Sequence, residues 1–344
     1  MRGLAAHLAA QDEVPIEFWG WADGIPFRTH PPHSARWLPR MGVPRTRFPR
    51  LLRWIMWARS AASAAAAVHI TDPNALVPVS RGRLMTTVYD LIPLHDADVA
   101  RPGGYDAYLN TLRSARSLFA ISQATADDVV ATLRPAAQHI LVARPGVEVP
   151  KSDDVSEAPI AGKFFLYVGS PDRHKNVDLL IEALRLSPEI VETLVIAGKW
   201  PENDVAALTA RAASNDVLRG RVKHLGYVDD TTLQSLYRHC TAAVVPSLIE
   251  GFGLPVAEAM AAGAAVVHSK IPVLEEASAG AALTFSPTSV TELSACLQRI
   301  SSDPGLREDL VSRGLHRAQA LTWGEAVATT LAEYRQAIEG PLAG

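Results

Sequence analysis

Two glutamates flank a glycine-broken turn in the segment SLIEGFGLPVAEAMAAG, residues 247–263. Glu250 lies in the turn, and Glu258 lies on a helix that the sequence predicts from Pro255 to about residue 262. Pro255 suits the first turn of a helix, where a missing N–H costs nothing, and Gly263 suits the C-terminal cap. The backbone N–H groups of such a turn point outward at the positive end of the helix. This segment therefore predicts an anion site.

The two carboxylates beside the predicted anion site suggest that the ligand also carries sugar hydroxyl groups. An ionised carboxylate accepts hydrogen bonds, and sugar hydroxyl groups donate them, so a phosphate-bearing sugar would suit residues 251–254. The alternative is an ordinary turn in which Glu258 only complements the helix dipole. It does not account for Glu250 together with Gly251 and Gly253, which weaken any regular element. We therefore favour a ligand site.

The second half of the chain contains alternating apolar runs and helical patterns that would position this turn. Such alternation predicts parallel βαβ units with right-handed crossovers, and thus a doubly wound sheet. Ligands of these sheets bind at the carboxyl ends of the strands, which is where the turn follows its strand. The predicted strands are 163–170, 192–199, 222–228, 241–247 and 264–269.

The first half repeats this pattern less clearly, with strand-like runs at 15–22, 68–71, 84–92, 117–122 and 139–143. Ser122 is placed to cap the helix that follows it. The chain starts in a helix-like segment, so this domain is expected to lack its first strand. The segment 144–163 has the proline, glycine and charge content of a linker, so we place the domain boundary there. Three helical stretches follow residue 289. We predict an N-terminal domain over 1–150, a C-terminal domain over 151–322, and a final helix over 323–344 that returns to the first domain.

Composition narrows the class of protein. The 344 residues include 33 basic and 36 acidic side chains, and a net charge of −3 gives no electrostatic case for nucleic-acid binding. Cys240 and Cys296 lie far apart in helix-like patterns, which argues against a disulfide framework or a zinc site. No apolar run approaches the ~20 residues that span a bilayer, and the start lacks a secretory signal. We expect a cytoplasmic protein.

Five sequence segments resemble those of a known family and occur in the same order as in that family. They are YDLIPL, FLYVGSPDRHKNVDLLIEAL, HLGYVDDTTLQSLYRHCTAAVVPS, VPSLIEGFGLPVAEAMAAGAAVVHS and LTWGEAVATTLAEYRQAI. Together they resemble the retaining family 4 glycosyltransferases of the GT-B fold (group 1, mannosyltransferase-like), from about residue 68 onward. The resemblance implies an α/β protein with two Rossmann-like domains that face a cleft, no metal, and no cofactor beyond a GDP- or UDP-linked sugar as donor.

The resemblance also implies residue roles. Glu250 would hold hydroxyls of the transferred sugar, and Glu258 those of the ribose. Lys175 would neutralise the diphosphate, with Arg173 as a weaker candidate because His174 stands where many relatives have arginine; both basic residues also suit a plain solvated turn. Further donor contacts would come from Gly251, Phe252, Gly253, Leu254, Gly169 and Ser170, and the nucleobase wall from Tyr227 and Val228.

In the first half, Asp90 is the candidate that would position an acceptor hydroxyl. Tyr89 stands where relatives often have a histidine, and His95 is a spare candidate. Asp96 to Asp98 spells a short metal motif of another fold, which we discount. The segment RLLRWIMWARS, residues 50–60, suits either a peripheral membrane helix for a lipid-linked acceptor or a helix packed on its own domain.

The expected function is transfer of a mannose-like hexose to a saccharide or lipid-linked acceptor, with retention of the anomeric configuration. Two alternatives stay open. One is another GT-B enzyme, such as a nucleotide-sugar 2-epimerase or a sugar phosphorylase. The other is a non-catalytic nucleotide-sugar binder or partner subunit.

Overall fold

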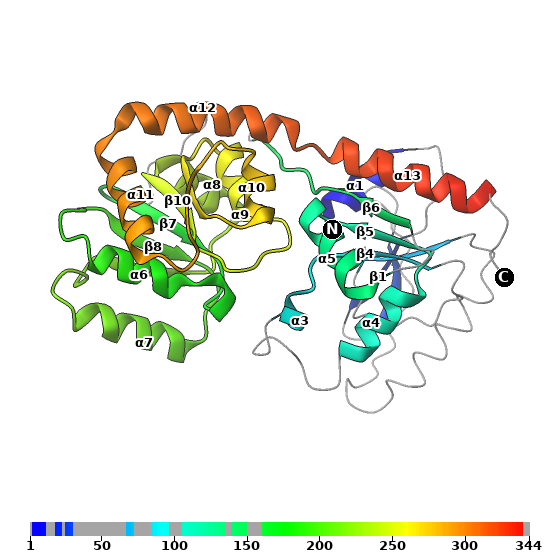
Figure 1. Ribbon diagram of the computed structural model, residues 1–344, viewed down its shortest axis with the longest axis horizontal. Helices are drawn as coiled ribbons and strands as arrows, with labels where there is room; N and C mark the ends of the chain where they lie inside the picture. The colour runs from blue at the N-terminus through cyan, green and yellow to red at the C-terminus, as the bar shows by residue number, and fades with distance from the viewer. Residues whose placement is uncertain are drawn as a thin grey trace. The chain divides into compact units, whose positions relative to one another are not determined.

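The computed structural model describes residues 2–11, 18–22, 25–29, 67–71, 84–95, 105–134, 139–149 and 160–339. The chain divides into two compact units (Figure 1). The first unit combines Met1–Gly146 with Trp323–Gly344, and the second unit is Val147–Thr322. The final segment thus belongs with the start of the chain, although the second unit separates them in sequence.

The second unit is built on a six-stranded parallel sheet in the order β12-β11-β10-β7-β8-β9. Strand β7, the first in sequence, lies at the centre between β8 and β10. This is the doubly wound order that the sequence predicts, and its direction reverses between β7 and β10. The strands are β7 Phe164–Val168, β8 Thr193–Ala197, β9 Val222–Gly226, β10 Ala242–Val245, β11 Val266–Ser269 and β12 Leu283–Phe285.

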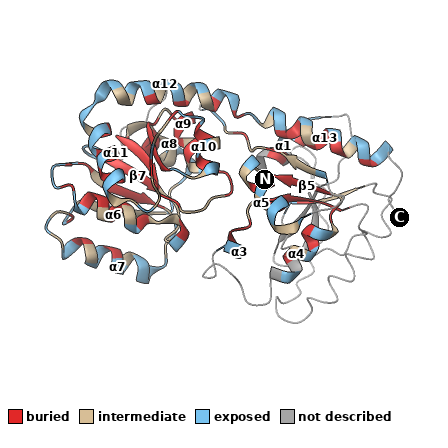
Figure 2. Ribbon diagram, in the orientation of Figure 1, coloured by how far each residue is buried: buried red, intermediate tan, exposed pale blue. Residues whose placement is uncertain are grey.

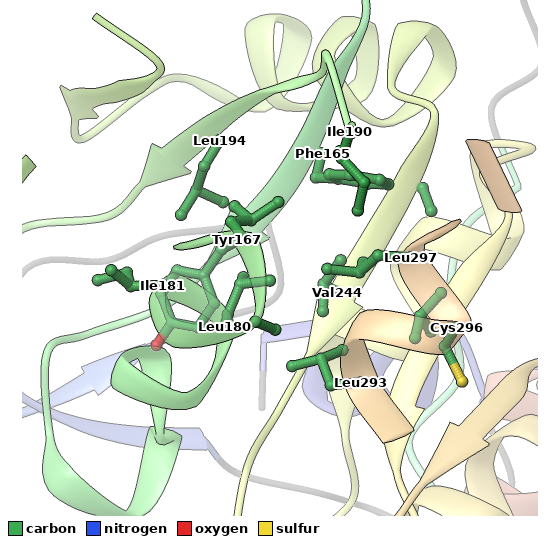
Figure 3. Packing of buried hydrophobic residues seen from close by; sticks show 14 of the residues in the cluster. Phe165, Tyr167, Leu180, Ile181, Ile190, Leu194, Val244, Leu293, Cys296 and Leu297 are labelled. Atoms are coloured by element: carbon green, nitrogen blue, oxygen red, sulfur yellow. The ribbon is translucent and has the colours of Figure 1, made fainter. Parts of the chain in front are cut away.

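The core of this unit forms because its central strands are apolar throughout. Phe165 and Tyr167 of β7 pack with Leu180 and Ile181 of the next helix, and Leu297 lies in the same cluster (Figure 3). Strands buried on both faces are typical of parallel sheets, and Figure 2 shows β7 buried where α7 and α12 are largely exposed. The helices are α6 Val177–Arg185, α7 Glu202–Ala213, α8 Asp230–His239, α9 Leu254–Ala261, α10 Pro272–Ser278, α11 Val290–Ser302 and α12 Pro304–Ala320.

The first unit contains a four-stranded parallel sheet in sequence order, β3-β4-β5-β6. Ser122 caps its helix α5 as predicted, because the serine hydroxyl accepts a hydrogen bond from the amide of Thr125 at 2.9 Å. The strands are β3 Val68–Ile70, β4 Leu84–Val88, β5 Ser117–Ala120 and β6 His139–Val142. The helices before the second unit are α1 Arg2–Ala9, α3 Ile92–His95, α4 Tyr105–Ser114 and α5 Gln123–Leu133.

Two strand predictions need correction, and one strand was missed. The run at 15–22 was expected among the parallel strands, but β1 Phe18–Ala22 pairs antiparallel with β2 Ile25–Thr29. Only two residues separate these strands, too few for the crossover that parallel pairing needs. The strand expected over 84–92 ends at Val88, and α3 follows it. Strand β12 was not predicted, because its three residues carry too little pattern.

Helix α13, Trp323–Glu339, completes the core of the first unit. Its residues Val327 and Leu331 pack in one cluster with Met85 of β4 and Phe119 of β5. Leu4 of α1 joins the same cluster, so the first and last described helices cover the sheet together.

Buried polar contacts fix α13 further. The Ser117 hydroxyl donates to Glu333 Oε1 at 2.5 Å, and the hydroxyl of Tyr334 lies 2.7 Å from His69 Nδ1. Burial lowers the pKa of His69 to about 4, so its imidazole is neutral at pH 7. These pairings satisfy polar groups that would be costly to bury alone.

Candidate active site

The candidate site lies at the point where the sheet of the second unit reverses direction. The segment after β7 carries Lys175, and the segment after β10 carries Glu250. Both strands end at the carboxyl edge of the sheet, and β7 pairs directly with β10. Ligands of doubly wound sheets bind at this reversal point.

Lys175 and Glu250 form an ion pair there, with Nζ 2.7 Å from Oε1. The Glu250 side chain is 8% exposed and that of Lys175 is 22% exposed. The hydroxyl of Ser247 donates to the same carboxylate oxygen at 2.7 Å, and the hydroxyl of Ser269 donates to the Ser247 carbonyl. One oxygen of Glu250 is therefore held by both a cation and a buried serine.

A tight turn delivers Lys175 to this position. Residues Arg173–Lys175 form a single 3₁₀ turn, and Asn176 follows it in the left-handed conformation with φ +56°. The Asn176 amide group donates to the carbonyls of Pro246 and Pro287, each at 3.0 Å. The amide of Leu248 donates to the His174 carbonyl at 2.7 Å. The two segments that carry the ion pair are thus hydrogen-bonded to each other.

The glycine turn leads into helix α9 close to where the sequence predicts it. Gly253 is the N-cap, with φ +85°, and a Cβ there would lie 2.4 Å from Leu274. Only glycine fits both the backbone angle and the contact. Phe252 is buried, as are Gly251 and Gly253 on either side of it, so the side chain anchors the turn. Leu254 begins the helix with its side chain partly exposed.

Glu258 lies one turn into α9 and is half-buried. Burial raises its pKa, and the negative charge of Asp230 on α8 raises it further. The neighbouring Tyr237 hydroxyl is buried and lacks a hydrogen-bond partner within the described part of the chain. Burial raises the pKa of Tyr237, and the charge of Glu258 adds to this. Glu258 thus faces α8, whereas Glu250 faces the segment after β7.

The other donor candidates follow strand ends of the same sheet. Gly169 and Ser170 directly follow β7 and precede the Lys175 turn. Tyr227 and Val228 directly follow β9, the edge strand, and the Tyr227 side chain is 79% exposed.

The first-half candidates lie in the other unit. Asp90 follows β4, and its Oδ1 accepts a hydrogen bond from the Ile92 amide at 3.0 Å. His95 Nε2 lies in hydrogen-bond contact with Asp128 Oδ2 at 2.8 Å, which accounts for its position without a ligand. Residues 96–98 and 50–60 lie outside the described residues.

Sequence reasoning overlooked several residues that hold the site. Ser247 precedes Glu250 by three residues, a spacing that suits a local side-chain contact. Trp200 donates its indole N–H to the Gly169 carbonyl, and nothing in its surrounding sequence indicated this. Across the described ranges, no three His, Cys, Asp or Glu residues gather as metal ligands. No helix in those ranges is long and apolar enough to cross a membrane.

A cation–carboxylate pair and a helix N-terminus lie at the reversal point, the place where ligands of doubly wound α/β proteins bind. Comparison with known proteins indicates the family. Residues 149–317 match the family described as glycosyl transferases group 1, and the chain therefore carries a glycosyltransferase domain of this group.

Individual relatives agree with this family. O-antigen chain mannosyltransferase B of Escherichia coli is 28% identical over 285 residues, which is 76% of this chain and 73% of that protein. Serotype-specific mannosyltransferase WbdA of Escherichia coli is 27% identical over 253 residues, 68% of this chain but 31% of that protein. This chain thus spans less than a third of WbdA.

A solved structure supports the fold. Sucrose-phosphate synthase from Thermosynechococcus elongatus is similar with a TM-score of 0.69 and 21% identity, over 98% of this chain and 92% of that chain. With its two parallel sheets, this protein has the GT-B fold, and the glycosyltransferase family match lies in its second unit.

Proposed function

We propose that this protein transfers a mannose-like hexose from a nucleotide-diphosphate sugar to an acceptor hydroxyl, with retention of the anomeric configuration. The observation that carries the proposal is the Lys175–Glu250 pair at the reversal point of the sheet, next to the N-terminus of α9. The similarity to mannosyltransferases supports the choice of sugar. A saccharide or lipid-linked saccharide is the proposed acceptor.

Electrostatic stabilisation is the main task of the proposed site. When the bond from C1 to the phosphate oxygen breaks, negative charge develops on the diphosphate. A lysine ammonium has three N–H donors, so one bond to Glu250 leaves two for phosphate oxygens. The N-terminus of α9 supplies further partial positive charge. These groups are already in place, so they stabilise the leaving group without reorganisation.

The two glutamates bind hydroxyls in this proposal and do not form a bond to the sugar. Retaining glycosidases use one carboxylate as a nucleophile about 5–5.5 Å from a second one. Here Oε1 of Glu250 is occupied by Lys175 and Ser247, which disfavours nucleophilic attack. The acceptor oxygen instead forms its bond to C1 on the face that the diphosphate leaves. The acceptor proton passes to the departing phosphate oxygen, so atoms and charge balance.

Each remaining residue has one proposed role. Glu258 accepts hydrogen bonds from the ribose, and Asp90 of the first unit positions the acceptor hydroxyl. The backbone of residues 251–253 contacts the sugar, and Tyr227 and Val228 flank the nucleobase. Arg173, on the same turn as Lys175, assists with the diphosphate. Neither a metal nor an additional cofactor takes part.

Turnover with defined donors tests this function. The purified protein is incubated with GDP-mannose, UDP-glucose or dTDP-glucose and a mannose oligosaccharide, with and without EDTA. We expect nucleoside diphosphate release that depends on acceptor, resists EDTA, and yields an α-linked product by NMR. A trapped glycosyl–Glu250 adduct would refute the mechanism. Donor binding without turnover would favour the non-catalytic binder, and an epimerised donor would favour the 2-epimerase.

A further inference from the structure

Two aromatic side chains hold consecutive carbonyl groups of the turn after β7. The indole N–H of Trp200 donates to the Gly169 carbonyl at 2.8 Å. The hydroxyl of Tyr167 donates to the Ser170 carbonyl at 2.7 Å. The two rings also touch edge to face, with centroids 6.5 Å apart and planes at 86°. We call Tyr167 and Trp200 the aromatic clamp.

The clamp is anchored in the core of the second unit. Tyr167 is 2% exposed, and Figure 3 shows its ring beside Leu180 and Ile181 with the hydroxyl at the end farther from Phe165. Burial raises the pKa of Tyr167, and the charges of Glu250 and Asp172 raise it further. The hydroxyl therefore stays protonated and remains a donor across the physiological range.

Backbone contacts close the other side of the turn. The Gly169 amide donates to the Ala197 carbonyl at 3.0 Å, and the Gly198 amide donates to the Gly226 carbonyl at 2.8 Å. A Cβ on Gly198 would lie 2.2 Å from the Gly169 oxygen. Glycine at 198 thus lets this oxygen approach closely while Trp200 bonds to it.

Fixing the Gly169 carbonyl also fixes the amide that follows it. A trans peptide is planar and holds its C=O and N–H on opposite sides, and no cis bond occurs in the described chain. The Ser170 N–H therefore points away from Trp200. The next bond leads to Pro171, which has no N–H, so Ser170 supplies the amide donor at this point of the turn.

We propose that Tyr167 and Trp200 are positioning residues that orient the Ser170 amide toward a phosphate oxygen of the nucleotide-sugar donor. This inference rests on the proposed function, because it takes the donor diphosphate to lie over the segment between β7 and Lys175. The hydrogen bonds of the clamp go to backbone carbonyls, so its effect on ligands passes through the turn. Trp200 fixes the peptide that carries the Ser170 amide, and Tyr167 fixes the peptide that follows it.

Binding of matched probes tests the clamp. GDP, UDP and dTDP are first titrated into the wild-type protein by calorimetry. The diphosphate that binds most tightly, and the nucleoside of the same base, are then titrated into Trp200→Phe and Tyr167→Phe. Each variant keeps an aromatic ring but loses one donor. Trp323→Phe in α13 is the control for the loss of an indole, and thermal melting shows that each variant is folded.

We expect each clamp variant to bind the diphosphate roughly tenfold more weakly, as the loss of about one buried hydrogen bond implies. Binding of the nucleoside should not change, and Trp323→Phe should behave as wild type. Equal weakening of both probes would show a general packing role and overturn the proposal, as would unchanged binding of both. If the wild-type protein binds none of the three diphosphates, the proposed function fails and the clamp's role falls with it.

Discussion

Replacement of Lys175 by methionine separates the structural role of the ion pair from its proposed catalytic role. The variant leaves the Glu250 carboxylate, only 8% exposed, with Ser247 as its hydrogen-bond partner among the residues that the structure describes. Breaking a fully buried pair costs about 3–5 kcal/mol, and an exposed pair contributes about 0–1 kcal/mol. Because Lys175 is 22% exposed, we expect an intermediate loss, about 2 kcal/mol of unfolding free energy. That corresponds to a melting temperature lower by roughly 4–8 °C.

The double variant Lys175→Met/Glu250→Gln provides the decisive comparison. The glutamine side chain at position 250 is neutral, so the double variant buries no uncompensated charge. It should therefore regain most of the stability that Lys175→Met loses. Turnover should not return, because removing one preorganised donor typically lowers kcat by about 10²–10³-fold. Thermal melting and kcat/KM with the active donor are measured for the wild type, both single variants and the double variant. A double variant as unstable as Lys175→Met, or a Lys175→Met enzyme with wild-type turnover, would refute the reasoning.

Three further predictions concern stability. Gly253→Ala should lower the free energy of unfolding by about 2–4 kcal/mol in urea denaturation, because alanine there combines a positive φ with a steric clash. Gly220 also has a positive φ but has open space around it, so Gly220→Ala should lower it by only about 1–2 kcal/mol. Equal losses would contradict the contact between residue 253 and Leu274. The pKa of Glu258 is raised above 4.5, so the folded state binds its proton more tightly and its contribution to stability falls as pH rises through the raised pKa. Glu258→Gln should therefore gain stability relative to wild type as pH increases from about 4 to 8, and a constant difference would count against the assigned burial. Ser122→Ala should cost about 1 kcal/mol through loss of the helix cap to Thr125, whereas Ser122→Asp should retain most of the stability.

The fold of the second unit was largely predictable because its central strands, β7 and β10, are uninterrupted apolar runs. Ala242–Val245 is buried at every position, so its pattern could not be mistaken for a half-exposed strand. The hairpin of β1 and β2 was harder, because a single run such as 18–22 does not reveal its pairing partner. Strand β12 has one exposed and one partly buried residue among three, which leaves no clear periodicity.

The candidate site was predictable in its residues but not in its contacts. Glu250 and Lys175 were both identified, yet 75 positions separate them and only the folded chain shows the ion pair. In the sequence, Tyr167 and Trp200 resemble ordinary core aromatics. Their proposed function depends on which groups the tyrosine hydroxyl and the indole N–H bond to, and the sequence does not show this. Such directional contacts depend on side-chain placement, which composition and spacing do not encode.

The position of α13 also bears on how the chain acquires its structure during synthesis. The ribosome makes the strands of the first unit early, but Val327 and Leu331, which cover Met85 and Phe119, emerge only after the whole second unit. Domains generally fold as units during translation, yet the first one here cannot bury this face of its sheet until the last helix arrives. The nascent polypeptide must therefore keep an apolar surface from aggregating for most of its elongation.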